Sequence, residues 1–319
     1  MLALGVDDRR VARVMLVDEA SGEVKWTVQA DERGIETQVV MSPDTGRFVA
    51  IVMGIYDERW KLLDAASGVV HREGAWHDGT GACICAKDHA NEQGCPVVAH
   101  TASIRTVAFS PCGRRLATGD EESTVILWDA QTGKVEQRMQ TGDDGGAIWS
   151  LSFSVTGMRL ASGDWNETIC IWDVTTTTGV LLRTIPEEIK EGARPGCKVR
   201  FSPTNNTLAS LHEQAPHFSE TKRGQIKVWD IESGEQAGSF NGRNFVVFSP
   251  DGRTIATASG KREQVVKLVD VESRAERCTM VGHDCGVSSS SFSVHPKHQT
   301  LNPQPFTLNP QSFTLSRQP

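Results

Sequence analysis

Short apolar runs separated by turn-forming residues dominate the pattern of this chain. Residues 100–133 contain three such runs: Val107–Phe109, Leu116–Ala117 and Val125–Trp128. The breaks between them, Pro111–Gly113 and Asp120–Ser123, are made of residues that favour tight turns. This stretch therefore predicts three short antiparallel β-strands. The polar segment that follows, residues 134–140, predicts a fourth, outermost strand.

The same unit recurs along most of the chain. A strand followed by a Phe-Ser-Pro-type turn is found around six positions: Met41, Phe109, Phe153, Phe201, Phe248 and, weakly, Phe292. A later apolar strand ends in aspartate, usually with glycine four residues on, at six positions: Asp18, Asp64, Asp129, Asp173, Asp230 and Asp270. The spacing between these aspartates indicates a repeat of about 40–45 residues with two insertions.

The third strand of each unit is apolar at consecutive positions, as in Val125–Trp128 and Ile169–Trp172. A sheet with one face in water would alternate apolar and polar residues instead. Each sheet is therefore expected to be covered on both faces by neighbouring sheets.

Three strand ends carry the dipeptide Trp-Asp: Trp128-Asp129, Trp172-Asp173 and Trp229-Asp230. Gly282-His283 precedes Phe292, and Ala99-His100 precedes Phe109 in a similar way. In these features residues 1–297 resemble the WD-repeat β-propeller family. The resemblance implies an all-β propeller of four-stranded antiparallel blades.

The strand count predicts six blades, and seven, the commoner number in the family, is the alternative. The N-terminal blade lacks its innermost strand, and Val287–Val294 is expected to supply it, so that strands from the two ends of the chain close the ring together. The predicted blades are residues 1–30 plus 284–297, 31–75, 100–141, 142–186, 187–240 and 241–281, with insertions at 71–98 and 212–224. Residues 298–319 form a proline-containing repeat and are predicted to be a disordered tail.

The resemblance also implies a structural hydrogen-bonded chain of His, Ser or Thr, an acid and the strand-end Trp inside each blade. One set of positions is His100, Thr118, Glu122 and Trp128, with glutamate where aspartate is expected, and the next unit keeps Ser162 and Trp172. A His-hydroxyl-carboxylate set also resembles a hydrolase triad. The sequence has no nucleophile elbow, P-loop, H-E-x-x-H or Rossmann glycine motif, so we expect no enzyme and no cofactor.

The 71–98 insertion is rich in thiols and imidazoles, which are zinc ligands. Its weak metal candidates are Cys83, Cys85, His89 and Cys95. Their spacing matches no common zinc pattern, so the preferred interpretation is a loop without metal.

Long loops on a rigid scaffold commonly carry binding function. Blade connectivity predicts that both insertions open on one face. The expected partner-binding residues on that face are Arg105, Trp149, Trp165 and Asn244, because Trp and Arg are over-represented at interface hot spots. Packing against neighbouring loops is the alternative role for these side chains.

The formal net charge of -7 and the scattered basic residues argue against a nucleic-acid surface. No apolar run is long enough for a membrane span, and no leader is recognised. We therefore predict a cytoplasmic or nuclear non-catalytic scaffold that binds proteins or peptides on its loop-bearing face, as a monomer or as a subunit of a complex. The alternatives are a regulatory propeller of a larger signalling or enzymatic protein, and a metal-binding propeller that uses the 71–98 insertion.

Overall fold

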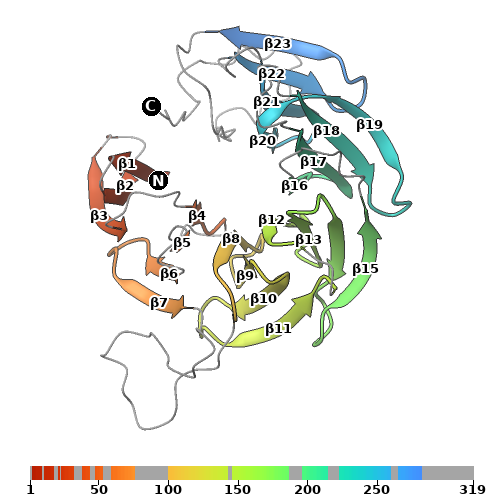
Figure 1. Ribbon diagram of the computed structural model, residues 1–319. Helices are drawn as coiled ribbons and strands as arrows, with labels where there is room; N and C mark the ends of the chain where they lie inside the picture. Colours follow the sequence, from red (N-terminus) through yellow and green to blue (C-terminus); the bar gives the residue numbers. More distant parts are fainter. Residues whose placement is uncertain are drawn as a thin grey trace. The chain divides into compact units, whose positions relative to one another are not determined.

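The computed structural model describes most of the chain as short strands and turns (Figure 1). The described residues are 2–8, 11–17, 21, 23–31, 38–43, 47–52, 59–75, 100–142, 146–186, 196–214, 223–259 and 265–281. Every helix or strand that they form is a β-strand. The chain divides into two compact units, Met1–Pro186 and Glu187–Pro319.

The first unit contains four successive antiparallel sheets, in each of which neighbouring strands follow one another in sequence. The strands of the first two sheets are β1 (Leu2–Asp8), β2 (Val11–Val17) and β3 (Val24–Asp31), then β4 (Gln38–Met41), β5 (Phe48–Val52), β6 (Arg59–Asp64) and β7 (Val70–Ala75). Those of the next two are β8 (Ile104–Phe109), β9 (Arg115–Asp120), β10 (Thr124–Asp129) and β11 (Val135–Gln140), then β12 (Ile148–Phe153), β13 (Arg159–Asp164), β14 (Ile169–Asp173) and β15 (Val180–Ile185).

The second unit contains two sheets of the same design. Their strands are β16 (Cys197–Phe201), β17 (Thr207–Gln214), β18 (Arg223–Asp230) and β19 (Gln236–Asn241), then β20 (Arg243–Phe248), β21 (Thr254–Ser259), β22 (Val265–Asp270) and β23 (Glu276–Val281). Each is a four-stranded antiparallel meander, as predicted for a propeller blade.

Of the six predicted blades, five are four-stranded sheets in the described residues. The sixth sheet, β1–β3, has three strands, and β1 lies at its edge. The fourth strand expected from Val287–Val294 lies outside the described residues, as does the 298–319 tail. Closure of the ring therefore stays a prediction.

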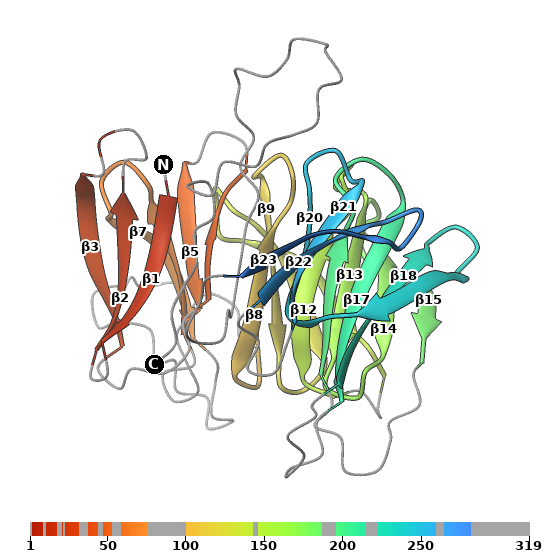
Figure 2. The same ribbon diagram turned by 90° about the horizontal axis from the view of Figure 1, so that it is seen from above.

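Apolar cores lie between adjacent sheets, as the sequence pattern predicted. In the first unit, Leu62 of β6 packs with Ile126 of β10, and Leu127 of β10 packs with Leu160 of β13. In the second unit, Val228 of β18 packs with Val246 of β20. Figure 2 shows β8 beside β12, and residues of β12 contact residues of both β8 and β9. The third strand of a blade is buried on both faces because each face belongs to a different core.

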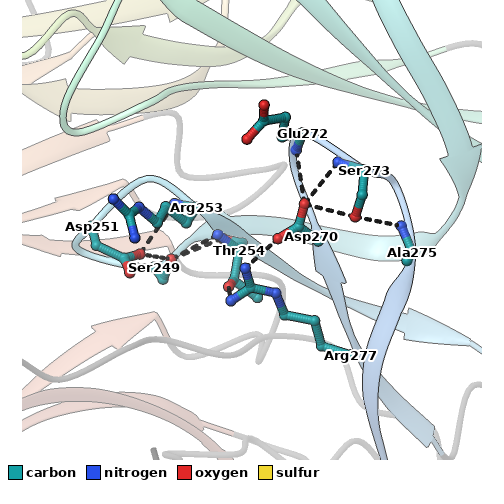
Figure 3. Close-up of polar contacts among 9 residues, drawn as sticks. All are labelled: Ser249, Asp251, Arg253, Thr254, Asp270, Glu272, Ser273, Ala275 and Arg277. Carbon is teal, nitrogen blue, oxygen red and sulfur yellow. Dashed lines mark hydrogen bonds and ion pairs between the residues drawn. The ribbon is translucent and has the colours of Figure 1, made fainter. Parts of the chain in front are cut away.

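The aspartate that ends each third strand stabilises the turn after it, as Figure 3 shows for Asp270. Asp270 Oδ1 accepts hydrogen bonds from the backbone N–H of Ser273 (2.7 Å) and of Glu272 (3.1 Å) and from the Ser273 hydroxyl (2.8 Å). The Ser273 bonds, together with the guanidinium of Arg277, lower the pKa of Asp270 to about 2. Arg274 stands where other units have glycine, and it adopts the same left-handed conformation, with φ of 62°.

Each outermost strand contains one extra residue near its start. In the β14–β15 pair, Trp172 faces Leu181 and Ile171 faces Arg183, which leaves Leu182 as the extra residue. Similar shifts occur in the β10–β11, β18–β19 and β22–β23 pairs. These β-bulges twist the outer strand relative to its partner.

Described strands overlap the ends of both predicted insertions. The first overlaps β7, which ends at Ala75, and residues 76–99 lie outside the described part of the chain. The second was predicted over 212–224, but β17 continues to Gln214 and β18 starts at Arg223. Antiparallel pairing between these two strands extends as far as Gln214 opposite Arg223, so both ends of this segment belong to strands.

Candidate protein-interaction site

A buried hydrogen-bonded chain crosses the β8–β11 blade. The Trp128 indole N–H donates to Thr118 Oγ1 over 2.7 Å, and His100 Nε2 lies 2.6 Å from the same hydroxyl oxygen. His100 Nδ1 lies 2.7 Å from Asp120 Oδ2. All four side chains are buried, the most exposed being Trp128 at 7%. The structure thus brings together His100, Thr118 and Trp128 from β9, β10 and the segment that precedes β8.

Burial lowers the pKa of His100 below its usual 6.5, although the bond to Asp120 acts in the opposite direction. The neutral ring then donates from Nδ1 to the carboxylate and accepts the Thr118 hydroxyl proton at Nε2. The hydroxyl oxygen is left to accept the Trp128 N–H. The other carboxylate oxygen of Asp120 accepts the backbone N–H of Glu122 (3.0 Å) and of Thr124 (2.8 Å), so this buried set of hydrogen bonds holds the blade and its turn together.

The acid of this chain is Asp120 and not Glu122, which corrects the sequence prediction. Asp120 is the last residue of β9 and lies opposite Ile104, so its carboxylate reaches the buried ring of His100. Glu122 lies two residues further on, in the exposed turn, and accepts a hydrogen bond from the Thr101 hydroxyl (2.8 Å).

The next blade has a shorter version of the chain. The Trp172 indole N–H donates to Ser162 Oγ over 3.0 Å. Asp164 occupies the position of Asp120 and accepts the Thr168 N–H over 2.8 Å. Burial raises the pKa of Asp164 above its usual 3.8.

The β16–β19 blade contains a variant that the sequence analysis missed. The Trp229 indole N–H donates to Ser210 Oγ (2.8 Å), and His212 Nε2 lies 2.7 Å from the same oxygen. His212 faces Cys197 across the strand pair, where the other blades place Asp120 and Asp164. Counting two residues from Ser210, as from Thr118 to Asp120, would have identified His212.

Two predicted partner-binding residues, Arg105 and Trp149, occupy matching bulges on neighbouring blades. Ile104 faces Asp120 and Thr106 faces Gly119, so that Arg105 is the extra residue of β8. Trp149 is the extra residue of β12 in the same way. Residues of β8 and β12 contact each other. β-Bulges redirect side chains and are common beside functional sites.

The bulge residue and the turn residue after the buried acid pair with each other in both blades. In the β8–β11 blade, Arg105 Nε donates to Glu121 Oε1 over 2.7 Å, and the guanidinium forms an ion pair with that carboxylate. Their side chains are 23% and 37% exposed. In the β12–β15 blade the matching pair is aromatic. The rings of Trp149 and Trp165 pack edge to face, with centroids 5.0 Å apart.

The turns that carry these pairs are tied together. The Ser123 hydroxyl donates to the carbonyl of Gly146 (3.1 Å), which connects the β9–β10 turn to the segment that enters the next blade. The Trp165 N–H donates to the carbonyl of Ala147 over 2.8 Å. A Cβ added to Gly146 would lie 3.0 Å from the Cβ of Trp165, so the backbone passes closely beneath that side chain. Trp165 stays 37% exposed on this support. We call Arg105, Glu121, Trp149 and Trp165 the Trp165 surface.

The other candidates lie in the second compact unit or outside the described residues. Asn244 lies in β20 of the second compact unit, where it has φ of 61° and its carbonyl accepts a hydrogen bond from the Lys198 ammonium. The metal candidates Cys83, Cys85, His89 and Cys95 lie outside the described residues. Where side chains are described, no group of three His, Cys, Asp or Glu residues could hold a metal ion. Among the same residues, no helix is long and apolar enough to cross a membrane.

Successive four-stranded meanders with shared cores, and the Trp–hydroxyl–His–carboxylate chain in the β8–β11 blade, are features that this protein shares with WD-repeat β-propellers. Residues 93–129 and 135–173 match the family model described as "WD domain, G-beta repeat". These residues correspond to most of the β8–β11 and β12–β15 blades. The resemblance to the WD-repeat family is thereby confirmed.

Two curated proteins are similar to parts of the chain. The first is "Nuclear distribution protein PAC1" of Coccidioides posadasii (strain C735), 27% identical over 200 residues, which are 58% of this chain and 38% of that protein. The second is "Probable cytosolic iron-sulfur protein assembly protein Ciao1" of Culex quinquefasciatus, 51% identical over 37 residues, which are 12% of this chain and 11% of that protein. The chain thus matches less than half the length of either relative.

Proposed function

We propose that this chain is a non-catalytic scaffold that binds proteins or peptides through the Trp165 surface. The observation that carries the proposal is the partly exposed side chain of Trp165, which packs against Trp149, together with the Arg105–Glu121 ion pair at the matching position of the neighbouring blade. Rigid aromatic side chains and arginine provide a large share of binding energy at protein interfaces. Because the turns beneath them are already tied together, little ordering would oppose association.

The test compares proteins that co-purify with the wild-type chain and with Trp165→Ala or Arg105→Ala. Both variants should lose a partner by at least tenfold, which corresponds to ~1.4 kcal/mol. Far-UV circular dichroism should be unchanged because both side chains are partly exposed. Val24→Ala, at an exposed apolar residue of β3, is the matched control. Identical partner sets for the wild type and both variants would overturn the assignment of this surface.

A regulatory propeller within a larger protein is the second candidate, favoured by the small share of each relative that this chain matches. A longer transcript that contains this sequence would support it. The names of the two relatives favour a cytoplasmic or nuclear setting, and we propose the same for this chain as a monomer or complex subunit. We retain Asn244 as a further binding candidate in the second unit. Zinc that is lost on Cys83→Ser would instead favour the metal-binding alternative.

We also propose that residues 1–297 form one propeller whose β1–β3 blade is completed by Val287–Val294. The position of β1 at the edge of a three-stranded sheet supports this, because its outer backbone groups need a partner.

A further inference from the structure

The outermost strand of the β12–β15 blade has an unusual apolar surface. Val180, Leu181 and Leu182 follow one another at the start of β15, and they are 45%, 43% and 48% exposed. Elsewhere in the described residues, no outermost strand has three exposed aliphatic residues in a row. The strand β11, for comparison, reads Val-Glu-Gln-Arg-Met-Gln.

Further exposed apolar residues lie at the same end of this blade. Val155 and Met158, in the β12–β13 turn, are 43% and 57% exposed. The Met158 carbonyl accepts the Val174 N–H over 3.0 Å, and the adjoining residues Arg159 and Asp173 pair with each other. Asp173 in turn pairs with Val180, so the turn and β15 border the same corner of the blade. Soluble proteins rarely expose such a cluster without a binding role.

β15 also has backbone groups available for pairing. It is the last strand of its sheet, and no described strand pairs with its outer side (Figure 1). Edge strands of soluble proteins are commonly protected by charges, prolines, β-bulges or short length, and of these β15 has the bulge at Leu182 that the other outermost strands share. Within β15 the only charged residue is Arg183, and proline appears only after the strand, at Pro186.

We propose that β15 is a second docking site, separate from the Trp165 surface, at which an extended peptide segment of a partner adds as a fifth strand. Main-chain hydrogen bonds would hold the segment, and aliphatic residues at alternate positions would cover Val180–Leu182. Polar residues at the positions in between would face solvent.

The size of the surface favours a peptide over a second copy of this chain. The five exposed side chains present on the order of 400 Å² of apolar surface, which is typical of a small functional patch. Two such patches together would bury on the order of 800 Å², whereas stable protein–protein interfaces bury about 1,200–2,000 Å². A single extended segment, about six residues long, matches the length of β15.

The probe is a fluorescein-labelled, acetylated and amidated octapeptide of alternating valine and glutamate, titrated by anisotropy against the intact chain. Saturable binding in the micromolar range is expected. The same peptide with N-methyl groups on every second residue keeps its side chains but cannot pair along one edge, so its binding should be lost.

Leu182→Gln should weaken binding about tenfold, because it replaces an apolar contact by a polar side chain of similar size. Ala237→Gln introduces the same polar side chain at the matching bulge of β19 and should leave the affinity unchanged. The proposal is overturned if the N-methylated peptide binds equally well, if Leu182→Gln has no effect, or if nothing binds at about 1 mM. A dimer that sedimentation detects and Leu182→Gln dissociates would also overturn it, in favour of a second copy.

Discussion

The strongest test of the buried chain in the β8–β11 blade is Thr118→Val. This substitution keeps the shape of the side chain and removes the hydroxyl that lies 2.6 Å from His100 Nε2 and 2.7 Å from Trp128 Nε1. Thr118 is fully buried, and the two nitrogens lie in side chains that are 1% and 7% exposed, so water cannot readily replace the lost partner.

Each buried group left without its partner costs about 1–3 kcal/mol. The loss of two partners should therefore lower the free energy of unfolding by about 2–6 kcal/mol. Ser162→Ala is an internal comparison, because it removes a hydroxyl that accepts one such bond, from Trp172. It should cost about 1–2 kcal/mol. Thr118→Val is thus expected to be about twice as destabilising as Ser162→Ala.

Urea denaturation followed by tryptophan fluorescence and circular dichroism measures both variants. Hydrogen exchange of the Trp128 indole N–H should accelerate in Thr118→Val and not in Ser162→Ala. Thr101→Val provides the control, since it makes the same chemical change at an exposed threonine that bonds Glu122, and it should alter stability by less than about 0.5 kcal/mol. Our interpretation of these buried hydrogen bonds is wrong if Thr118→Val lowers the free energy of unfolding no more than Ser162→Ala does.

Two further predictions concern protonation and close packing. Because the folded-state pKa of His100 is lowered from 6.5, the unfolded chain binds a proton that the folded chain excludes, so stability should fall as pH decreases below 6.5 toward the lowered pKa. Denaturant titrations at several pH values between 8 and 5 give the free energy of unfolding at each pH. This free energy should change less steeply with pH in His100→Asn than in the wild type, and an equal pH dependence would contradict the assignment. Gly68 and Gly157 have φ of 71° and 69°, but a Cβ on Gly68 would lie 2.8 Å from the Trp26 ring, whereas one on Gly157 makes an ordinary contact. Gly157→Ala should therefore cost about 1 kcal/mol and Gly68→Ala clearly more, and equal unfolding midpoints would show that the Trp26 ring yields.

The sequence predicted the repeat and its turns because their chemistry is local. An aspartate that accepts hydrogen bonds from residues two and three positions later needs only those residues, as Asp270 and Ser273 illustrate. The same local bonds explain why Arg274 can replace glycine at φ of 62°. The burial of Ile126 and Leu127 on both faces was likewise readable from consecutive apolar residues.

The sequence predictions were wrong or incomplete where the position of a residue depends on strand length or on strand pairing. Glu122 and Asp120 differ by two positions, and only the pairing of β8 with β9 selects Asp120. His212 was assigned to an insertion because its blade has a longer second strand, whose extent depends on the residues paired across from it. The sequence analysis also missed the exposed residues Val180–Leu182 of β15. Three consecutive apolar residues are typical of a buried strand, and only the arrangement of the strands shows that no described strand covers them.

The cores between adjacent sheets have a consequence for dissecting this protein. Each core consists of residues from two adjacent blades. A chain that is cut at a blade boundary therefore keeps all strand pairs within its blades but exposes the apolar face of its last sheet to solvent. A truncation after Gln140, for example, would leave Ala117, Val125 and Leu127 facing solvent. Choosing boundaries from secondary structure alone is therefore not enough to obtain soluble fragments. Blades should be removed from one end, and the apolar side chains that become exposed should be replaced by polar ones.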